Sequence, residues 1–200
     1  MKEKLKKLFA YYGPYKSLFY SDMFFAILGA AVTLVIPLVV RHITNEVVYF
    51  EKPQAREAIL MLGGLMVALV LLEIFCNFYI AYFGHIMGAK MEADMRRDIF
   101  GHYQKLTFAF YDNQKVGHLL SRITSDLFDI SELLHHGPED LVISVIKIIG
   151  SFAILLAVNV RLAFVAFAFI PVMAVFAFYF NGKMGKAFKR NRQKIAEINS

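Results

Sequence analysis

The sequence predicts an all-α membrane protein, because its apolar residues gather into long stretches that are separated by charged helical segments. Apolar residues make up 58% of the chain and charged residues only 19%, a balance typical of membrane proteins. Between two pairs of apolar stretches lies a polar stretch with helical periodicity, at residues 85–140. The apolar stretches, each long enough to cross a bilayer, cover residues 23–40, 58–84, 141–160 and 162–182.

Residues 1–22 are expected to form an amphipathic elbow in the membrane interface, since apolar and aromatic residues alternate there with lysines at helical spacing. A cleaved signal peptide is the alternative. The apolar stretch that follows is too long for a signal peptide and lacks a clean small-residue cleavage site. We therefore expect residues 23–40 to be the first transmembrane helix, loosened near its end by Pro37.

Basic residues flank the apolar stretches at both ends of the chain, which predicts that both ends lie on the cytoplasmic side. They are Lys2, Lys4, Lys6, Lys7 and Lys16, and then Lys183, Lys186, Lys189, Arg190, Arg192 and Lys194. Residues 41–57 balance acidic and basic side chains, which suits an outside loop. The formal net charge of +6 comes without any recognition motif, so no nucleic-acid partner is expected. The expected location is the plasma (cytoplasmic) membrane, multi-pass, with the N-terminus in the cytoplasm.

The polar stretch predicts a hairpin of two helices that leaves the membrane and returns to it. An apolar stripe at helical spacing continues the second span outward, through Met91, Met95, Ile99, Tyr103, Leu106 and Phe110. We expect this helix to run to Phe110 and to break at Asp112-Asn113-Gln114. A second helix then returns until Gly137-Pro138 interrupts it. A long helical hairpin outside the membrane can act as a lever on the membrane helices, which implies a partner outside the membrane that moves it.

The C-terminal part predicts a tight turn at Asn159-Val160-Arg161, a fourth span that contains Pro171, and a basic segment that still favours helix. No cap or stop signal ends this last helix, so the chain is expected to be the first portion of a longer protein.

Around the predicted break the hairpin contains a motif made of Phe110-Tyr111-Asp112-Asn113, Val116-Gly117, Ser121-Arg122 and Asp126, preceded by Gly88, Met91, Arg96, Phe100 and Leu106. This motif resembles the first intracellular loop of ATP-binding-cassette (ABC) exporters. That family shows a stretch that reads roughly F-Y-D/E-x-x-x-x-G-x-[LIV]-[LIV]-S-R-[LIV]-x-x-D. Pro37-Leu38 and Ile170-Pro171 are similar to parts of the family's first and fourth helices, so the resemblance covers essentially the whole chain.

The resemblance implies an exporter-type helical bundle with four of its six spans present and with long helices that extend into the cytoplasm. Residues 23–200 are then a partial transmembrane domain. The complete half-transporter has a nucleotide-binding domain that uses ATP and Mg²⁺, and two halves form a homodimer or a heterodimer. This chain has no G-x-x-x-x-G-K-[ST] sequence, so we expect it to bind no cofactor, to carry no catalytic residue and not to hydrolyse ATP alone.

The expected partners are membrane lipids, the chain's own downstream spans and nucleotide-binding domain, a second half-transporter, and an amphipathic or hydrophobic substrate such as a drug, lipid or peptide. Two other classes stay open. One is a self-contained four-span scaffold or sensor that docks a cytoplasmic partner through residues 85–140. The other is a secondary transporter driven by protonation of Glu73 and Lys147.

By resemblance, a coupling helix contacts the nucleotide-binding domain through Tyr111, Asp112, Asn113, Gln114, Lys115, Val116 and Gly117. Asp112 can cap this helix, and Gly117 allows a close backbone approach. A solvated, idle helix–loop–helix tip is the alternative. Ser121, Arg122 and Asp126 are expected to tie adjacent intracellular helices together, with Arg122 and Asp126 as an i,i+4 pair.

Glu73 and Lys147 are charges inside apolar stretches, and such charges usually face a bundle interior or a wet cavity. With Asn77 on the same helical face as Glu73, they are candidates to line a central cavity. The alternative is that Glu73 pairs locally and Lys147 extends to the membrane interface. His135 and His136 are adjacent and are expected to point apart, so no metal site is predicted.

Overall fold

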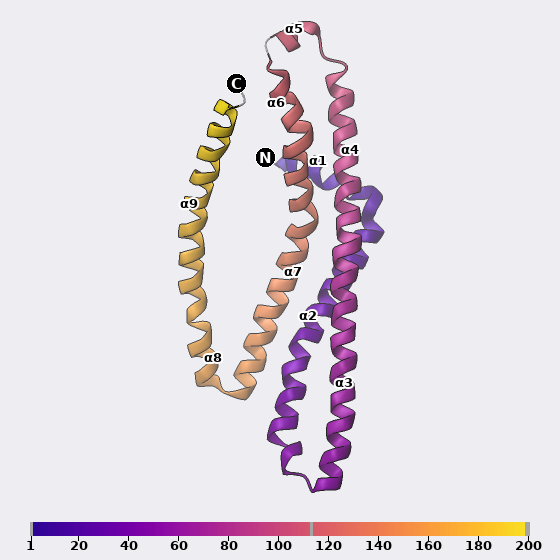
Figure 1. Ribbon diagram of the computed structural model, residues 1–200, viewed down its shortest axis with the longest axis vertical. Coiled ribbons are helices and arrows are strands. Elements are labelled where there is room, and N and C mark those ends of the chain that lie inside the picture. The colour runs from indigo at the N-terminus through magenta and orange to yellow at the C-terminus, as the bar shows by residue number, and fades with distance from the viewer. Residues whose placement is uncertain (1, 113, 199–200) are drawn as a thin grey trace. The chain divides into compact units, whose positions relative to one another are not determined.

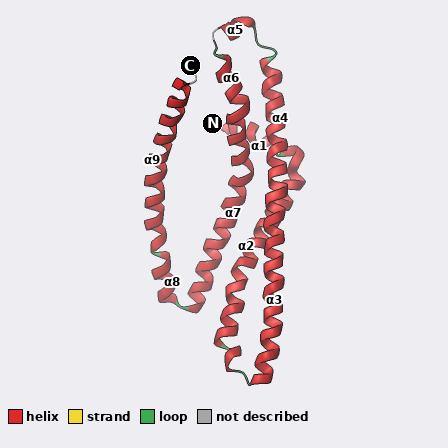
Figure 2. Cartoon of the chain, viewed as in Figure 1, coloured by secondary structure: helices red, strands yellow, loops and turns green. Residues whose placement is uncertain are grey.

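The structure, a computed structural model, describes residues 2–112 and 114–198, and all four apolar stretches are helical except at Asn159 and Ala168 (Figures 1 and 2). No β-strand occurs in this described part, which confirms the predicted all-α fold. The chain divides into two compact units, Met1–Ile148 and Ile149–Ser200. Helical segments long and apolar enough to cross a membrane are Lys6–Tyr49, Lys52–Tyr103, Val116–Val158 and Val160–Phe188.

The N-terminal elbow consists of α1 (Lys2–Ala10), a 3₁₀ turn η1 (Gly13–Tyr15) and the first turns of α2 (Lys16–Asn45). Pro14 lies at the start of the turn, where its fixed φ suits the tight geometry. The first long helix therefore begins before the predicted residue 23. Pro37 lies within α2 and does not end it.

After the 3₁₀ turn η2 (Val47–Tyr49), the chain forms α3 (Lys52–Tyr79), a π-helical segment η3 (Ile80–Gly84) and α4 (His85–Tyr103). These last three elements follow one another without an intervening loop, so the predicted helical continuation of the second apolar stretch into the polar hairpin is confirmed. The helix ends at Tyr103, earlier than the predicted Phe110.

The returning arm of the hairpin contains α5 (Phe108–Asp112), α6 (Val116–Ser121), a π-helical segment η4 (Arg122–Asp126) and α7 (Leu127–Val158). The predicted interruption at Gly137-Pro138 is wrong, because α7 continues through Pro138. Proline removes one helical hydrogen bond, and the buried residues on both sides of it hold the helix together across that gap. These residues are Leu134, His135 and Glu139.

The base of the hairpin is the main buried cluster of the first unit, where the elbow packs against α4 and α7. Its members are Tyr12, Met87, Met91, Met95, Leu127 and Leu134, and we call this cluster the hairpin base. The methionine stripe predicted from periodicity thus becomes the face that α4 buries. Many large apolar side chains elsewhere on the long helices are exposed, which is typical of surfaces that face lipid.

The second unit holds the end of α7, α8 (Val160–Phe167) and α9 (Phe169–Ile198). Asn159 alone makes the predicted turn, and its side-chain oxygen caps α8 by accepting a hydrogen bond from the Leu162 N–H at 3.1 Å. Pro171 cannot donate a helical hydrogen bond, which accounts for the break between α8 and α9 at Ala168. The basic segment is helical to Ile198, as predicted.

Candidate functional site at the hairpin tip

The tip of the hairpin, residues 104–121, begins where α4 ends. Figure 1 shows the short α5 lying across the end of the hairpin, between α4 and α6. The Tyr111 hydroxyl donates a hydrogen bond to the backbone oxygen of Tyr103 at 2.6 Å. This bond joins α5 to the last residue of α4 and fixes the direction in which the chain turns.

The residues predicted to form the coupling helix are divided among three segments. Tyr111 and Asp112 end α5, Gln114 and Lys115 form the link, and Val116 and Gly117 begin α6, while Asn113 lies outside the described residues. The short transverse helix is therefore Phe108–Asp112, which precedes most of the predicted residues. Asp112 does not cap the next helix: the N-cap of α6 is Lys115, which makes no side-chain cap hydrogen bond.

The hairpin tip presents apolar surface that the described chain leaves uncovered. Phe108 is 89% exposed and Val116 is 68% exposed. A Cβ atom added at Gly117 would meet no described atom within 4 Å, so this glycine is open to a neighbour from outside. An apolar pocket of about 220 Å³ lies beside it, lined by Phe100, Tyr103, Gln104, Tyr111, Val116, Leu119, Leu120 and Ile123.

The tie between the two arms of the hairpin is made by Arg96. Its Nε donates a hydrogen bond to the backbone oxygen of Ile123 at 3.0 Å, and its guanidinium also pairs with Glu92. Arg122 and Asp126 form no ion pair in the described structure. They lie within the π-helical segment η4, whose wider turn displaces residues four apart from the alignment of an α-helix.

The elbow is attached to the hairpin by three tyrosine hydroxyls, those of Tyr11, Tyr12 and Tyr15, of which the sequence predicted only Tyr12 and Tyr15 as membrane-interface residues. Tyr11 donates to the Asp98 carboxylate at 2.8 Å, and Tyr15 donates to the Asp94 carboxylate at 2.7 Å. Tyr12, which is buried, donates to a backbone oxygen of α7, that of Leu134. The sequence signal was present, because these tyrosines follow helical spacing, but their partners lie about 80 or more positions away.

The candidate cavity residues are not brought together. The Thr33 hydroxyl, on α2, donates to the Glu73 carboxylate at 2.9 Å. Glu73 and Lys147 form no ion pair in the described structure, and Asn77 is exposed. Close packing of α2 on α3 makes the Thr33 contact possible, since a Cβ at Gly29 would lie 3.2 Å from the Cβ of Cys76. The contact is the local pairing that the alternative interpretation of Glu73 describes.

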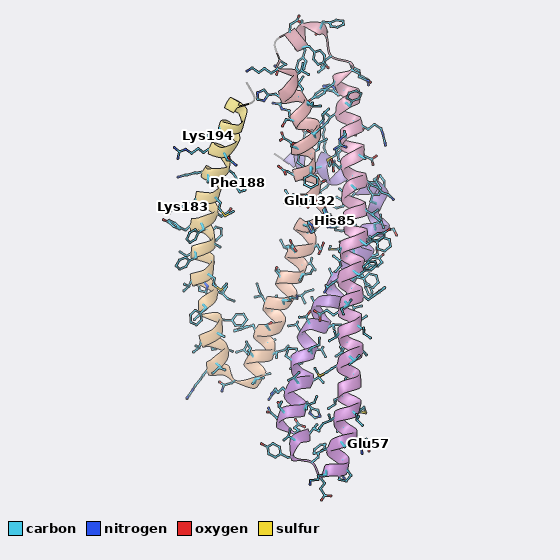
Figure 3. All side chains as sticks on the ribbon, viewed as in Figure 1. Glu57, His85, Glu132, Lys183, Phe188 and Lys194 are labelled. Carbon is cyan, nitrogen blue, oxygen red and sulfur yellow. The ribbon has the colours of Figure 1, made fainter. Side chains whose placement is uncertain are left out.

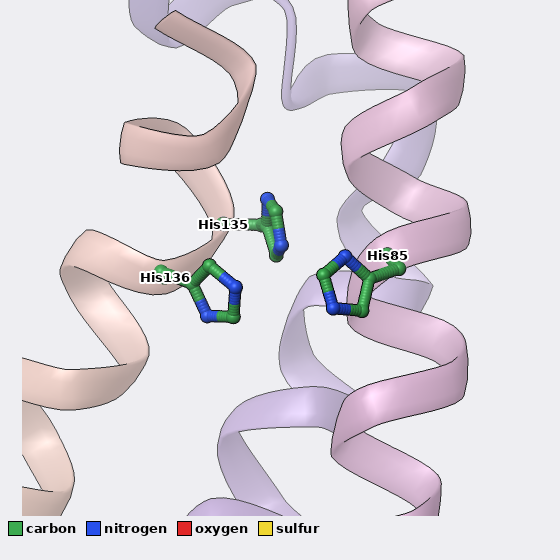
Figure 4. A group of neighbouring side chains, drawn as sticks. All are labelled: His85, His135 and His136. Atoms are coloured by element: carbon green, nitrogen blue, oxygen red, sulfur yellow. The ribbon is translucent and has the colours of Figure 1, made fainter. Parts of the chain in front are cut away.

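The expectation that His135 and His136 point apart is wrong. Their ring centroids are 4.1 Å apart, and both rings lie close to His85 of α4 (Figure 4). Neighbouring residues on a helix differ by about 100° in direction. Long side chains can still converge across that angle when both lean toward the same adjacent helix.

Within the part of the chain that the structure describes, four membrane-length helices and a helical hairpin outside the apolar stretches define the transmembrane domain of a multi-pass membrane protein. The sequence pattern of the ABC transporter transmembrane region matches residues 19–200. The chain therefore belongs to this family, and its fold is that of an ABC exporter transmembrane domain.

Relatives from Bacillus subtilis match nearly the whole chain. An uncharacterized ABC transporter ATP-binding protein, YwjA, is 39% identical over 98% of the chain, and a second, YknU, is 29% identical over 99%. A putative multidrug export ATP-binding/permease protein, YgaD, is 22% identical over 97%. The chain covers 34%, 33% and 34% of these relatives, respectively, or about a third of their length.

Proposed function

We propose that this chain is the front part of the transmembrane domain of an ATP-driven exporter, and that its hairpin tip receives movement from a nucleotide-binding domain. The observation that carries the proposal is the tip itself. Exposed apolar side chains, an open Gly117 and an apolar pocket are gathered at the end of a hairpin whose two arms are tied together. Exposed apolar patches of this kind mark interaction sites.

In the proposed mechanism, ATP and Mg²⁺ bind to nucleotide-binding domains that lie outside residues 1–200. Closure of two such domains, one from each half of a homodimer or heterodimer, displaces the hairpin tips. Arg96 links α4 to Ile123, so a push on the tip moves both arms together. Binding energy then shifts the population between inward-facing and outward-facing states.

The distribution of charge supports the proposed orientation. Lysines and arginines at both ends of the chain favour a cytoplasmic N-terminus and a cytoplasmic hairpin in the plasma membrane. An amphipathic or hydrophobic substrate, such as a drug, lipid or peptide, fits the apolar composition. The description of one relative as a putative multidrug export protein supports the same class.

Replacement of Gly117 by tryptophan tests the coupling role. The side chain would project into the space that the partner domain is proposed to occupy, so we expect transport to fall by about tenfold or more while the protein remains folded and ATP hydrolysis continues. A loss of that size corresponds to about 1.4 kcal/mol of coupling energy. Transport and ATPase activity are measured in proteoliposomes that contain the intact protein.

Gly63→Trp is the matched control, because a Cβ at Gly63 also meets no described atom within 4 Å but lies on α3, away from the tip. Normal transport in Gly117→Trp, or an equal loss in both variants, would contradict the coupling role.

We also propose that Glu73, Asn77 and Lys147 line the substrate pathway. Glu73→Gln keeps an oxygen that can accept the Thr33 hydrogen bond but removes the charge. If the charge faces substrate, transport and substrate-stimulated ATPase activity should fall severalfold with little change in thermal stability. Unchanged transport together with unchanged stimulation would remove Glu73 from the pathway and leave it as a local partner of Thr33.

A further inference from the structure

A cluster of histidines lies between α4 and α7, beside the hairpin base. One ring nitrogen from each of His85, His135 and His136 lies within 4.8 Å of the others. Figure 4 shows His135 and His136 reaching from α7 toward His85 on α4, and Figure 3 places His85 and Glu132 at this level of the hairpin. Imidazole nitrogens grouped in this way are typical ligands of divalent transition metals.

The hydrogen bond that His135 makes determines which of its two ring nitrogens can bind a metal ion. Its Nδ1 lies 2.9 Å from the backbone oxygen of Ser131, so Nδ1 carries the proton and donates. The Nε2 atom is left with its lone pair, and it makes no hydrogen bond with any described residue although His135 is only 2% exposed. A histidine fixed by a backbone carbonyl through one nitrogen is the arrangement found in metal sites.

Two buried carboxylates near the histidines have oxygens that make no hydrogen bond in the described structure. Asp22 of α2 is fully buried, and neither of its oxygens makes a hydrogen bond in the described structure. Glu139 is 7% exposed, and its Oε2 also makes no hydrogen bond but lies 3.8 Å from the Nδ1 of His136. Burial of a charged carboxylate costs several kcal/mol unless a cation compensates for the charge or the group takes up a proton.

Two glycines make room for these side chains. A Cβ atom at Gly88 would lie 2.7 Å from the Nδ1 of His135. A Cβ atom at Gly84 would lie 3.4 Å from the Oδ1 of Asp22 and 3.8 Å from the Cδ2 of His135. Asp22 and His135 therefore lie next to the same glycine, so the carboxylate of α2 adjoins the histidines.

We propose that His85, His135 and His136 bind one divalent transition-metal ion of the zinc class, with the carboxylate of Asp22 or Glu139 as the fourth ligand. Tetrahedral zinc with nitrogen ligands at about 2.1 Å separates them by about 3.4 Å, so modest ring movements would close the group around an ion. Mg²⁺ and Ca²⁺ are not the preferred ions for this site, because they favour oxygen ligands over histidine nitrogens. The ion would join α4 to α7 beside the hairpin base, whether or not the hairpin tip contacts a nucleotide-binding domain.

The test uses the intact protein, purified in detergent without a polyhistidine tag and stripped of metal with a chelator. Zn²⁺ is titrated against a competing chromophoric chelator, and Co²⁺ serves as the spectroscopic probe. We expect one tightly bound ion per chain and a Co²⁺ absorption spectrum of tetrahedral nitrogen and oxygen coordination. Absence of stoichiometric binding overturns the proposal, as does X-ray absorption of the zinc-loaded protein that shows fewer than three histidine ligands.

His85→Gln and His136→Gln identify the site, because His85 is exposed and His136 is only partly buried, so neither change disrupts the core. Loss of a ligand should weaken Zn²⁺ binding by at least the roughly 10- to 100-fold that accompanies loss of a supporting residue. His102→Gln, an exposed histidine at the far end of α4, is the matched control and should leave affinity within about twofold. Unchanged affinity in both site variants, or equal weakening in the control, overturns the proposal.

Discussion

At the hairpin base, Met87 and Met91 of α4 are fully buried in one cluster with Tyr12 and Leu134, whereas at the hairpin tip Phe108 is 89% exposed. Both regions are apolar and both are helical. The difference is that the base has its partners within the chain, supplied by the elbow and by α7. The tip has no such partner among the described residues.

The comparison indicates how the hairpin can work as a lever. The base is held by side-chain packing and by hydrogen bonds from the elbow, all within the described chain. The tip keeps its apolar surface available for a second protein. Movement imposed at the uncovered tip is transmitted along the arms only if packed and hydrogen-bonded contacts connect the tip to the base.

The largest effect is expected at Gly88, where Gly88→Ala would test how tightly the base is packed. The new Cβ would lie 2.7 Å from a ring that is buried and hydrogen-bonded to Ser131, so the ring cannot simply move aside. We expect a loss of about 1–3 kcal/mol in stability, which is typical of overpacking. The apparent Tm of the purified protein measures it.

Gly101→Ala on the same helix is the control, since its Cβ would meet no described atom within 4 Å. That change should stabilise the helix by up to about 1 kcal/mol. Equal Tm values for the two variants would show that the base is looser than described.

A smaller effect is expected from Tyr12→Phe, which removes the hydroxyl that donates to Leu134 and keeps the ring. A buried carbonyl that loses its donor costs about 1–2 kcal/mol. Tyr20→Phe is the comparison, because Tyr20 is exposed and should change stability by less than about 0.5 kcal/mol. If thermal unfolding does not separate the two variants, the elbow is not part of the rigid base.

The smallest effect is expected from Arg96→Gln, at the junction between base and tip. Loss of the hydrogen bond to Ile123 should cost about 0.5–1 kcal/mol and raise amide hydrogen exchange in residues 122–126. Arg97→Gln removes only an exposed contact with Asp94 and should leave exchange there unchanged. Similar exchange in both variants would mean that the two arms are not tied by Arg96.

Much of the hairpin was predictable because its apolar residues recur in the sequence at helical spacing. The apolar stripe of Met91, Met95 and Ile99 predicted the buried face of α4, and the four apolar stretches predicted the membrane-length helices. The end of α4 at Tyr103 was not predictable, because the apolar stripe continues past it to Phe110. Where the helices of the tip begin and end depends on the hydrogen bond from the Tyr111 hydroxyl to the backbone oxygen of Tyr103, which no local sequence pattern reveals.

The histidines give the clearest case of what local reasoning misses. His135 and His136 differ by one position, and only the approach of α4, with Gly84 and Gly88 at the contact, directs both rings toward His85. Asp22 reaches the same place from a third helix.

By itself, the sequence determined the all-α class, the four apolar spans, the polar hairpin between them and the likeness to ABC exporters. These features depend on composition, periodicity and short motifs, which are properties of neighbouring residues. Only the tertiary structure decided which side chains are buried together at the base, which apolar surface stays open at the tip, and that three histidines and a buried aspartate share one site. Contacts between distant helices set those outcomes, because the free energy of a buried or exposed group depends on what the other helices place beside it.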